Sequence, residues 1–167
     1  MKPSADIGVR SATEKDVPLI LSFVRELAAY ERLSHEVKAD ESMLRECLFG
    51  ARSYAEALIA ESQGLPAGFA LFFHNVSTFL GRPGIYLEDL YVKPELRGLG
   101  IGRTLLAHLA GLATERSCGR LEWAVLDWNE PAIRFYKSLG AVPMREWTVF
   151  RLTGESLERV AELDQES

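Results

Sequence analysis

The chain has 167 residues, of which 47% are hydrophobic and 26% are charged, and its formal net charge is −5 at pH 7. A chain of this length can bury one good core, and no linker or change of composition divides it. We therefore expect a single domain over residues 1–167 with its core at about 7–152. The negative charge argues against a nucleic-acid binder and suits the attraction of cationic amines.

The N-terminal part of the chain begins with a predicted strand over residues 7–11, followed by a helix. Two residues are candidate N-caps of this helix, Thr13 and Asp16. Asp16 is favoured because Pro18 then falls in the first turn. Apolar residues recur at helical spacing from there on, which predicts one face packed on the core. These residues are Leu19, Ile20, Phe23, Val24 and Leu27.

A second helix and a hairpin are predicted next. Residues 40–49 have a helical pattern that ends at Gly50, since glycine is common at the end of a helix. Residues 54–61 and 67–75 are rich in alanine and larger apolar residues and are typical of strands. The connection over residues 62–66 contains glycine and proline, which indicates a turn between the two strands.

The central part of the chain joins a strand directly to a glycine-rich helix start. Residues 85–92 mix apolar, aromatic and acidic side chains in a strand-like pattern, and Pro94 stops this strand. The turn after it leads into a helix predicted over residues 102–116. Because glycine lets a ligand approach the backbone closely, free N–H groups and the helix dipole can converge there on phosphate oxygens. The turn carries three alternate glycines, Gly98, Gly100 and Gly102.

Two common phosphate-binding motifs do not fit these glycines. A Walker loop needs a lysine followed by serine or threonine, which this loop lacks. A dinucleotide fingerprint needs a glycine where Arg103 or Leu105 stands. The form that remains is R-x-x-G-x-G, which runs from Arg97 to Gly102. The glycines by themselves would fit a simple tight turn equally well, so a second motif is needed.

That second motif follows another strand-like run at residues 121–126. Asn129 can cap a helix, Pro131 suits its first turn, and Gly140 can take the left-handed conformation that ends it. The spacing from Asn129 onward is N-x-x-A-x-x-F-Y-x-x-x-G-A. The sequence therefore predicts a strand followed by a capped helix.

Together, the two motifs resemble those of the GNAT N-acetyltransferase superfamily. Residues 26–31, 86–92 and 125–129 are similar to its diamine (spermidine/spermine) and thialysine acetyltransferase branch, whereas residues 77–84 and 142–151 depart from that branch. The resemblance covers nearly the whole chain. It implies an α/β fold with a mixed, mostly antiparallel sheet flanked by helices, and acetyl-CoA as co-substrate.

The resemblance also implies where the coenzyme binds. Backbone groups of the central strand would hold the pantetheine arm at Leu90, Tyr91 and Val92, where that strand splays from its neighbour. The glycine loop and the second motif would complete this site. They contribute Arg97, Gly98, Leu99, Gly100, Ile101, Gly102, Arg103, Asn129, Pro131 and Ala132.

Acetyl transfer needs a neutral amine, a polarised carbonyl and a proton for the leaving thiolate. The resemblance assigns that proton to Tyr136; the alternative is that Tyr136 only fills core beside Phe135. Glu88 and Asp89 are adjacent on a strand, so their side chains are expected on opposite faces. The resemblance favours Glu88 for binding the amine or relaying its proton, and Asp89 then has a structural or rim role.

Further residues match acceptor-binding positions of the branch less securely. For each of them, an ordinary surface or packing role fits equally well. They are Tyr30, Glu31, Glu122 and Trp123.

The remaining features limit cofactors and location. No window reaches the apolar length needed to span a membrane. Cys47 and Cys118 are too few for a disulfide framework, and the three histidines lack the spacing of metal ligands. We therefore expect a cytoplasmic protein with reduced thiols, no metal and no membrane partner.

The C-terminal part is predicted to complete the sheet with a strand over residues 147–152, followed by a short polar helix over 155–163. The apolar side chains of this strand offer a surface for the homodimer that the resemblance implies. The function predicted for the whole chain is transfer of acetyl from acetyl-CoA to a primary amine of a small molecule, by direct attack. The acceptor would be a diamine, polyamine or lysine-like amine. A protein or peptide N-acetyltransferase and a non-catalytic acyl-CoA-binding domain are the alternatives, and the presence of both Tyr136 and Glu88 argues against the second.

Overall fold

The computed structural model describes residues 6–164. The chain divides into two compact units, Met1–Leu126 and Asp127–Ser167. In the described residues, the first unit contains a five-stranded sheet and three α-helices, and the second contains two α-helices.

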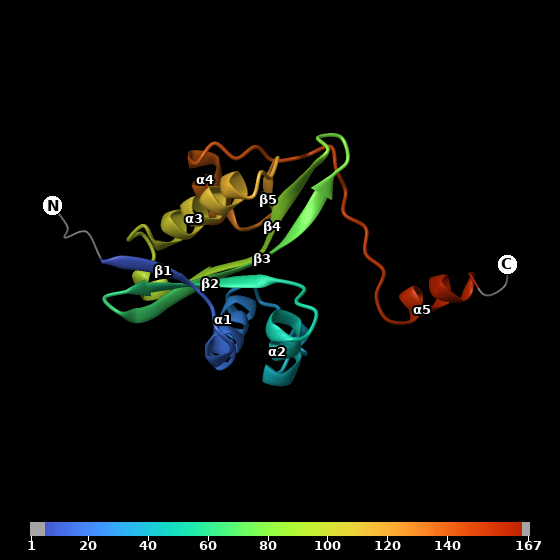
Figure 1. Cartoon of the computed structure of the whole chain (residues 1–167), viewed down its shortest axis with the longest axis horizontal. Helices are drawn as coiled ribbons and strands as arrows, with labels where there is room; N and C mark the ends of the chain where they lie inside the picture. Colours follow the sequence, from blue (N-terminus) through green and yellow to red (C-terminus); the bar gives the residue numbers. More distant parts are fainter. Residues whose placement is uncertain (1–5, 165–167) are drawn as a thin grey trace. The chain divides into compact units, whose positions relative to one another are not determined.

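The sheet of the first unit has its strands in chain order (Figure 1). The first four strands pair antiparallel, and the fifth joins the fourth in parallel. The predicted mixed, mostly antiparallel sheet is therefore confirmed. The strands are β1 (Ile7–Ser11), β2 (Glu56–Ser62), β3 (Leu65–Ser77), β4 (Arg82–Val92) and β5 (Leu121–Trp123).

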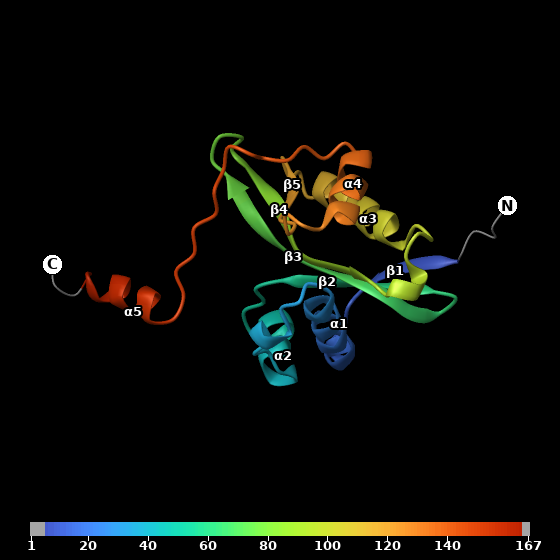
Figure 2. The ribbon, with the colours of Figure 1, turned by 180° about the vertical axis from the view of Figure 1, so that it is seen from behind.

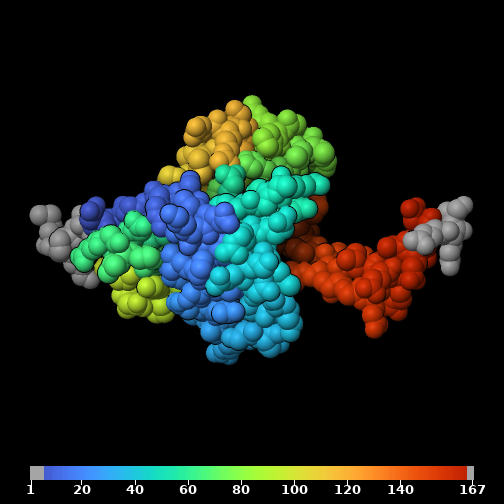
Figure 3. Space-filling view, turned by 60° about the horizontal axis from the view of Figure 1, so that its bottom comes forward, coloured from blue at the N-terminus to red at the C-terminus, as the bar shows by residue number. Residues whose placement is uncertain are grey.

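Helices cover both faces of this sheet. Helices α1 (Val17–Tyr30) and α2 (Glu41–Phe49) lie side by side on one face (Figures 1–3), and α3 (Ile101–Glu115) lies on the other (Figures 1 and 2). Under α1, the ring of Phe23 packs on Phe69 of β3 and Tyr91 of β4, with centroids 5.7 and 5.6 Å apart. The apolar stripe predicted for the first helix thus faces a core that includes the end of β4.

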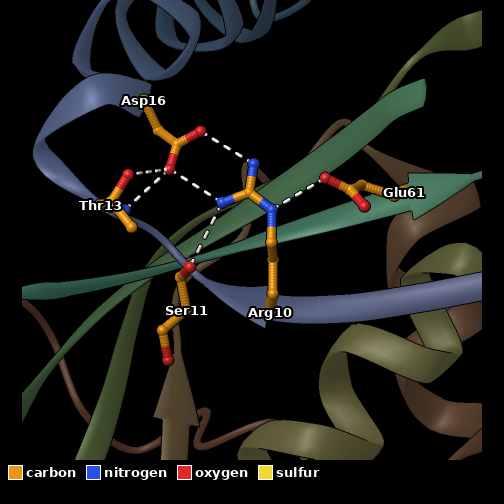
Figure 4. Close-up of polar contacts among 5 residues, drawn as sticks. All are labelled: Arg10, Ser11, Thr13, Asp16 and Glu61. Carbon is orange, nitrogen blue, oxygen red and sulfur yellow. Dashed lines mark hydrogen bonds and ion pairs between the residues drawn. The ribbon is translucent and has the colours of Figure 1, made fainter. Parts of the chain in front are cut away.

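A buried carboxylate fixes the start of α1 to the sheet (Figure 4). Asp16 accepts hydrogen bonds from both terminal nitrogens of Arg10 at 2.8 Å and from the Thr13 amide at 2.7 Å. Arg10 also donates from Nε to Glu61 on β2 at 2.8 Å. Asp16 is the N-cap residue as predicted, but its side chain makes no capping bond to α1. The Asp16 side chain instead joins β1 to the turn that precedes α1. The Arg10 guanidinium holds the pKa of Asp16 well below its ordinary range.

The β2–β3 connection is shorter than predicted. Only Gln63 and Gly64 form the turn, both with positive φ, at 54° and 75°. A two-residue turn of this handedness matches the twist of the paired strands, so the strands can begin immediately on either side. Leu65 and Pro66 therefore belong to β3, beside an irregularity in the pairing at Ala60.

The second unit begins with α4 (Glu130–Ser138), as the second motif predicts. The side chain of Asn129 caps the helix by accepting a hydrogen bond from the Ala132 amide at 3.4 Å. Gly140 has φ +88°, the left-handed conformation expected after the helix. The polar helix predicted near the C-terminus is α5 (Glu155–Glu162).

Two strand predictions need correction. The run at residues 121–126 forms a strand only over Leu121–Trp123. The strand predicted at 147–152 is absent, because that segment is irregular, and Trp147, Val149 and Phe150 are 71, 81 and 92% exposed. Aromatic and β-branched residues signal the capacity to pair, but a strand also needs a neighbouring backbone, and the described part of the second unit contains no strand.

Candidate active site

The end of β4 is paired on one side only. Strand β5 pairs with β4 at Ile85, Tyr86 and Leu87. Beyond Leu87, β4 continues against β3 alone within the described part of the chain. The register directs the N–H and C=O groups of Leu90 and Val92 away from β3, where a ligand can bond to those that have no partner in the protein.

The loop after β4 has the backbone needed to hold an anion. Gly98 and Gly100 have φ values of 79° and 95°, which other residues rarely adopt. Gly100 is the N-cap of α3, and the first helical hydrogen bond runs from the Thr104 amide to the Gly100 carbonyl. The amides of residues 101–103 precede that bond, so they have no partner inside the helix. These groups, at the positive end of the helix dipole, fit the pyrophosphate of acetyl-CoA.

Arg97, the first residue of this motif, is held against α1 and β4. Its Nε donates to the Val92 carbonyl at 3.0 Å. Its guanidinium carbon lies 4.4 Å from the centre of the Tyr30 ring and 5.9 Å from that of Tyr91. The last residue of α1 therefore contacts the first residue of the coenzyme motif, and no pattern in the sequence indicates this contact.

Tyr91 belongs to the core through its side chain. It is 3% exposed, and its hydroxyl donates to Glu26 of α1 at 2.7 Å. Burial and the hydrogen bond to Glu26 raise the pKa of Tyr91 above its ordinary value. The Tyr91 side chain is therefore engaged within the protein, and its backbone is paired in register with Phe69 of β3.

The two adjacent carboxylates of β4 lie at a β-bulge. Asp89 pairs with Leu71 and Leu87 pairs with Phe72, so Glu88 is the extra residue. A bulge breaks the strict alternation of faces on which the sequence argument relied. Glu88 is exposed, whereas Asp89 is half-buried.

Asp89 is the carboxyl group most affected by this arrangement. Burial, and then the charges of Glu88 and Glu31, raise its pKa from 3.8 to about 6. Burial also raises the pKa of Glu31, which follows the last residue of α1. Three acidic residues, from β4 and from the end of α1, are therefore brought near each other at the open end of β4. The sequence analysis assigned Asp89 only a structural or rim role. The one feature of the sequence that indicated a functional role for Asp89 was its position next to a second acidic residue in a strand.

The other predicted acceptor residues lie on β5. Glu122 forms an ion pair with Arg120, with Nε and Oε2 2.7 Å apart, and accepts a hydrogen bond from Asn75 at 3.1 Å. Its charge is therefore compensated within the protein, whereas none of the ion pairs between described residues involves Glu31, Glu88 or Asp89. Trp123 is half-buried and pairs in register with Leu87.

The predicted residues of the second unit lie on α4 and at its start. Asn129 is buried and caps the helix, and Pro131 lies in its first turn. Tyr136 is half-buried, and its ring lies 5.4 Å from that of Phe135 at a tilt of 49°. This ring contact is compatible with both roles considered for Tyr136, proton donor and core packing.

Comparisons with known proteins identify the family. The model of the acetyltransferase (GNAT) family matches residues 21–141. The thialysine N-epsilon-acetyltransferase of Bos taurus is 42% identical, over 94% of this chain and 98% of its own length. The L-ornithine N5-acetyltransferase of Arabidopsis thaliana is 31% identical, over 93% of this chain and 88% of its own length. A solved integron cassette protein from the mobile metagenome of V. cholerae has a TM-score of 0.77 and 29% identity, over 93% of this chain and 98% of that one.

The chain therefore belongs to the acetyltransferase (GNAT) family, which confirms the resemblance. It is an N-acetyltransferase that uses acetyl-CoA as co-substrate. Among residues 6–164, no group of three or more histidine, cysteine or acidic residues is arranged to hold a metal ion. None of the described helices is long and apolar enough to cross a membrane.

Proposed function

We propose that this enzyme acetylates the side-chain or terminal amine of a small lysine-like or diamine molecule. The observation that carries the proposal is the acidic group Glu31, Glu88 and Asp89 at the open end of β4, next to the coenzyme loop. A cationic amine is attracted to such a group, and the relatives named for thialysine and ornithine act on molecules of this kind.

The proposed reaction uses groups of β4 together with Tyr136, the proton donor that the family resemblance implies. The amine first gives up a proton, through water, to Glu88, and its lone pair then attacks the acetyl carbonyl. An open N–H of β4 stabilises the negative charge that develops on the carbonyl oxygen. The new C–N bond forms, the C–S bond breaks, and the departing thiolate takes a proton from the Tyr136 hydroxyl. The nitrogen, positively charged after the attack, gives its remaining extra proton to water, and water returns a proton to the Tyr136 phenolate.

The role of Tyr136 is tested by Tyr136→Phe. This change keeps the ring and its contact with Phe135 and removes only the proton donor. Turnover should fall by roughly 10² or more, with acetyl-CoA affinity nearly unchanged. Glu88→Gln should instead raise the acceptor KM or shift the pH profile of the rate toward higher pH. Wild-type turnover in Tyr136→Phe, measured where chemistry limits the rate, would assign Tyr136 to packing.

The acceptor is tested by measuring thiol release from acetyl-CoA with a panel of amines. The panel contains diamines, polyamines, lysine and its thioether analogue, ornithine, and a peptide with a free N-terminus. Activity with lysine-like compounds or diamines supports the proposal. Activity with the peptide alone would make the enzyme a protein N-acetyltransferase. Binding of CoA without acetylation of any amine would indicate an acyl-CoA-binding domain.

We also propose that the enzyme is a cytoplasmic homodimer. The segment at residues 147–152 supports a dimer because its apolar side chains are exposed and its composition is typical of a strand. A second copy of the chain would supply the backbone partner that this segment needs. The half-buried free thiols Cys47 and Cys118 are compatible with a reducing compartment.

A further inference from the structure

Arg97 is fixed at two points and has its outer edge available. Its Nε is used by the Val92 carbonyl, and the face of its guanidinium lies against the Tyr30 ring. The two terminal nitrogens make no hydrogen bond or ion pair with any described residue. An arginine binds a phosphate best through this outer edge, which can donate two parallel hydrogen bonds.

The Tyr30 ring lies against one face of the Arg97 guanidinium. An exposed arginine side chain has several rotatable bonds, and ordering it during binding costs free energy. Stacking on an aromatic ring removes part of this cost before the ligand arrives. The attraction between the cation and the ring stabilises the stacked position. Arg97 immediately precedes Gly98, so its position is coupled directly to the loop backbone.

We propose that Tyr30 is a positioning residue for Arg97, and that it acts on coenzyme binding and not on the acceptor. This inference rests on the proposed function only in taking residues 97–102 as the pyrophosphate site. It changes the role that the family resemblance suggested for Tyr30. The next residue, Glu31, lies near Asp89 and remains on the acceptor side. The C-terminal turn of α1 thus serves both substrates, through two consecutive residues.

The test is a double-mutant cycle in which calorimetry measures the binding of CoA. The variants are Tyr30→Leu, Tyr30→Phe, Arg97→Met and the double variant Tyr30→Leu/Arg97→Met. Tyr54→Leu is the matched control, because Tyr54 is exposed and stacks with Arg52 at 5.4 Å in the loop before β2. Circular dichroism checks that each variant is folded.

The expected result is a Kd for CoA that rises about threefold to tenfold in Tyr30→Leu and stays near wild type in Tyr30→Phe and Tyr54→Leu. The double variant should bind CoA no more weakly than Arg97→Met, since Tyr30 acts through Arg97. With acetyl-CoA saturating, the acceptor KM of Tyr30→Leu should stay within about twofold of wild type.

Three results would overturn the inference. They are an unchanged Kd in folded Tyr30→Leu, additive losses in the double variant, and a raised acceptor KM with normal CoA affinity. Because the cycle measures CoA binding, it decides the role of Tyr30 even if no amine in the acceptor panel is acetylated.

Discussion

Replacing Asp89 with asparagine should make the folded protein more stable at alkaline pH while impairing its use of the acceptor. Asp89 is half-buried at the bulge of β4, and its carboxyl lies near two other acidic groups. Asparagine has nearly the same shape but no charge to bury. The change therefore isolates the free-energy cost of the ionised carboxylate.

The size of the effect follows from the pKa of Asp89. A rise from 3.8 to about 6 on folding means that the folded state holds its proton more tightly than the unfolded chain does. Asp89 thus adds nothing unfavourable below about pH 4, and its cost grows as the pH rises from about 4 to about 6 and is complete above that. At about 1.4 kcal/mol per pKa unit, the full cost above pH 7 is up to about 3 kcal/mol.

Urea denaturation at pH 4.5 and pH 8 measures this difference. Asp89→Asn should exceed wild type by about 2–3 kcal/mol in unfolding free energy at pH 8 and by much less at pH 4.5. Asp6→Asn alters an exposed carboxylate, so its unfolding free energy should stay within about 0.5 kcal/mol of wild type at both pH values. The same Asp89→Asn enzyme should show a raised acceptor KM at pH 8. A stability difference that does not depend on pH, or a variant weaker than wild type at pH 8, would refute the reasoning.

Three further outcomes are expected. Gly100→Val should weaken CoA binding by more than tenfold in a folded protein, because φ +95° is unavailable to valine without displacing the loop. Gly81→Val, which places the same strain in the β3–β4 connection, should bind CoA normally, and equal affinities in both variants would contradict the loop assignment. Asp16→Asn should lose about 2–4 kcal/mol of unfolding free energy at pH 7, since it removes the buried one of the two carboxylates that pair with Arg10. Because the pKa of Asp16 is lowered, wild type should keep this advantage down to about pH 4 in urea denaturation, and loss of it at pH 6 would contradict the pairing. Light scattering at micromolar concentration should give a dimer for wild type and a monomer for Phe150→Asp, and a monomeric wild type would remove the dimer proposal.

Local signals were enough to predict most elements of the fold. The helix around Asn129 carries its own cap and its own terminating glycine, and the structure has both. The mixed sheet was expected from the family resemblance, and the hydrophobic pattern located the strands to within a few residues. Where prediction failed, at residues 147–152, the pattern was strand-like but the outcome depended on a partner outside the segment.

The candidate site was predictable where it consists of backbone. The alternate glycines marked this loop in the sequence as one whose backbone an anion can approach, and in the structure Gly98 and Gly100 have positive φ values that favour glycine. The contact of Arg97 with Tyr30 and the proximity of Asp89 to Glu31 join residues more than 55 positions apart in the chain. The bulge at Glu88 has no glycine to mark it, so the environment of Asp89 could not be derived from alternation along the strand.

The one-sided pairing of β4 has a consequence for how the enzyme tolerates change. A ligand that bonds to the main chain of residues 88–92 contacts N–H and C=O groups, which nearly every amino acid possesses. Side chains such as those of Leu90 and Val92 are then free to be exchanged for others of similar size, as far as that ligand is concerned. Proline alone deletes a donor outright. On the proposed assignment, the β4 part of the donor site is therefore robust to substitution, while the acidic residues proposed for the acceptor are not, so new acceptors can be acquired with this part of the donor site left intact.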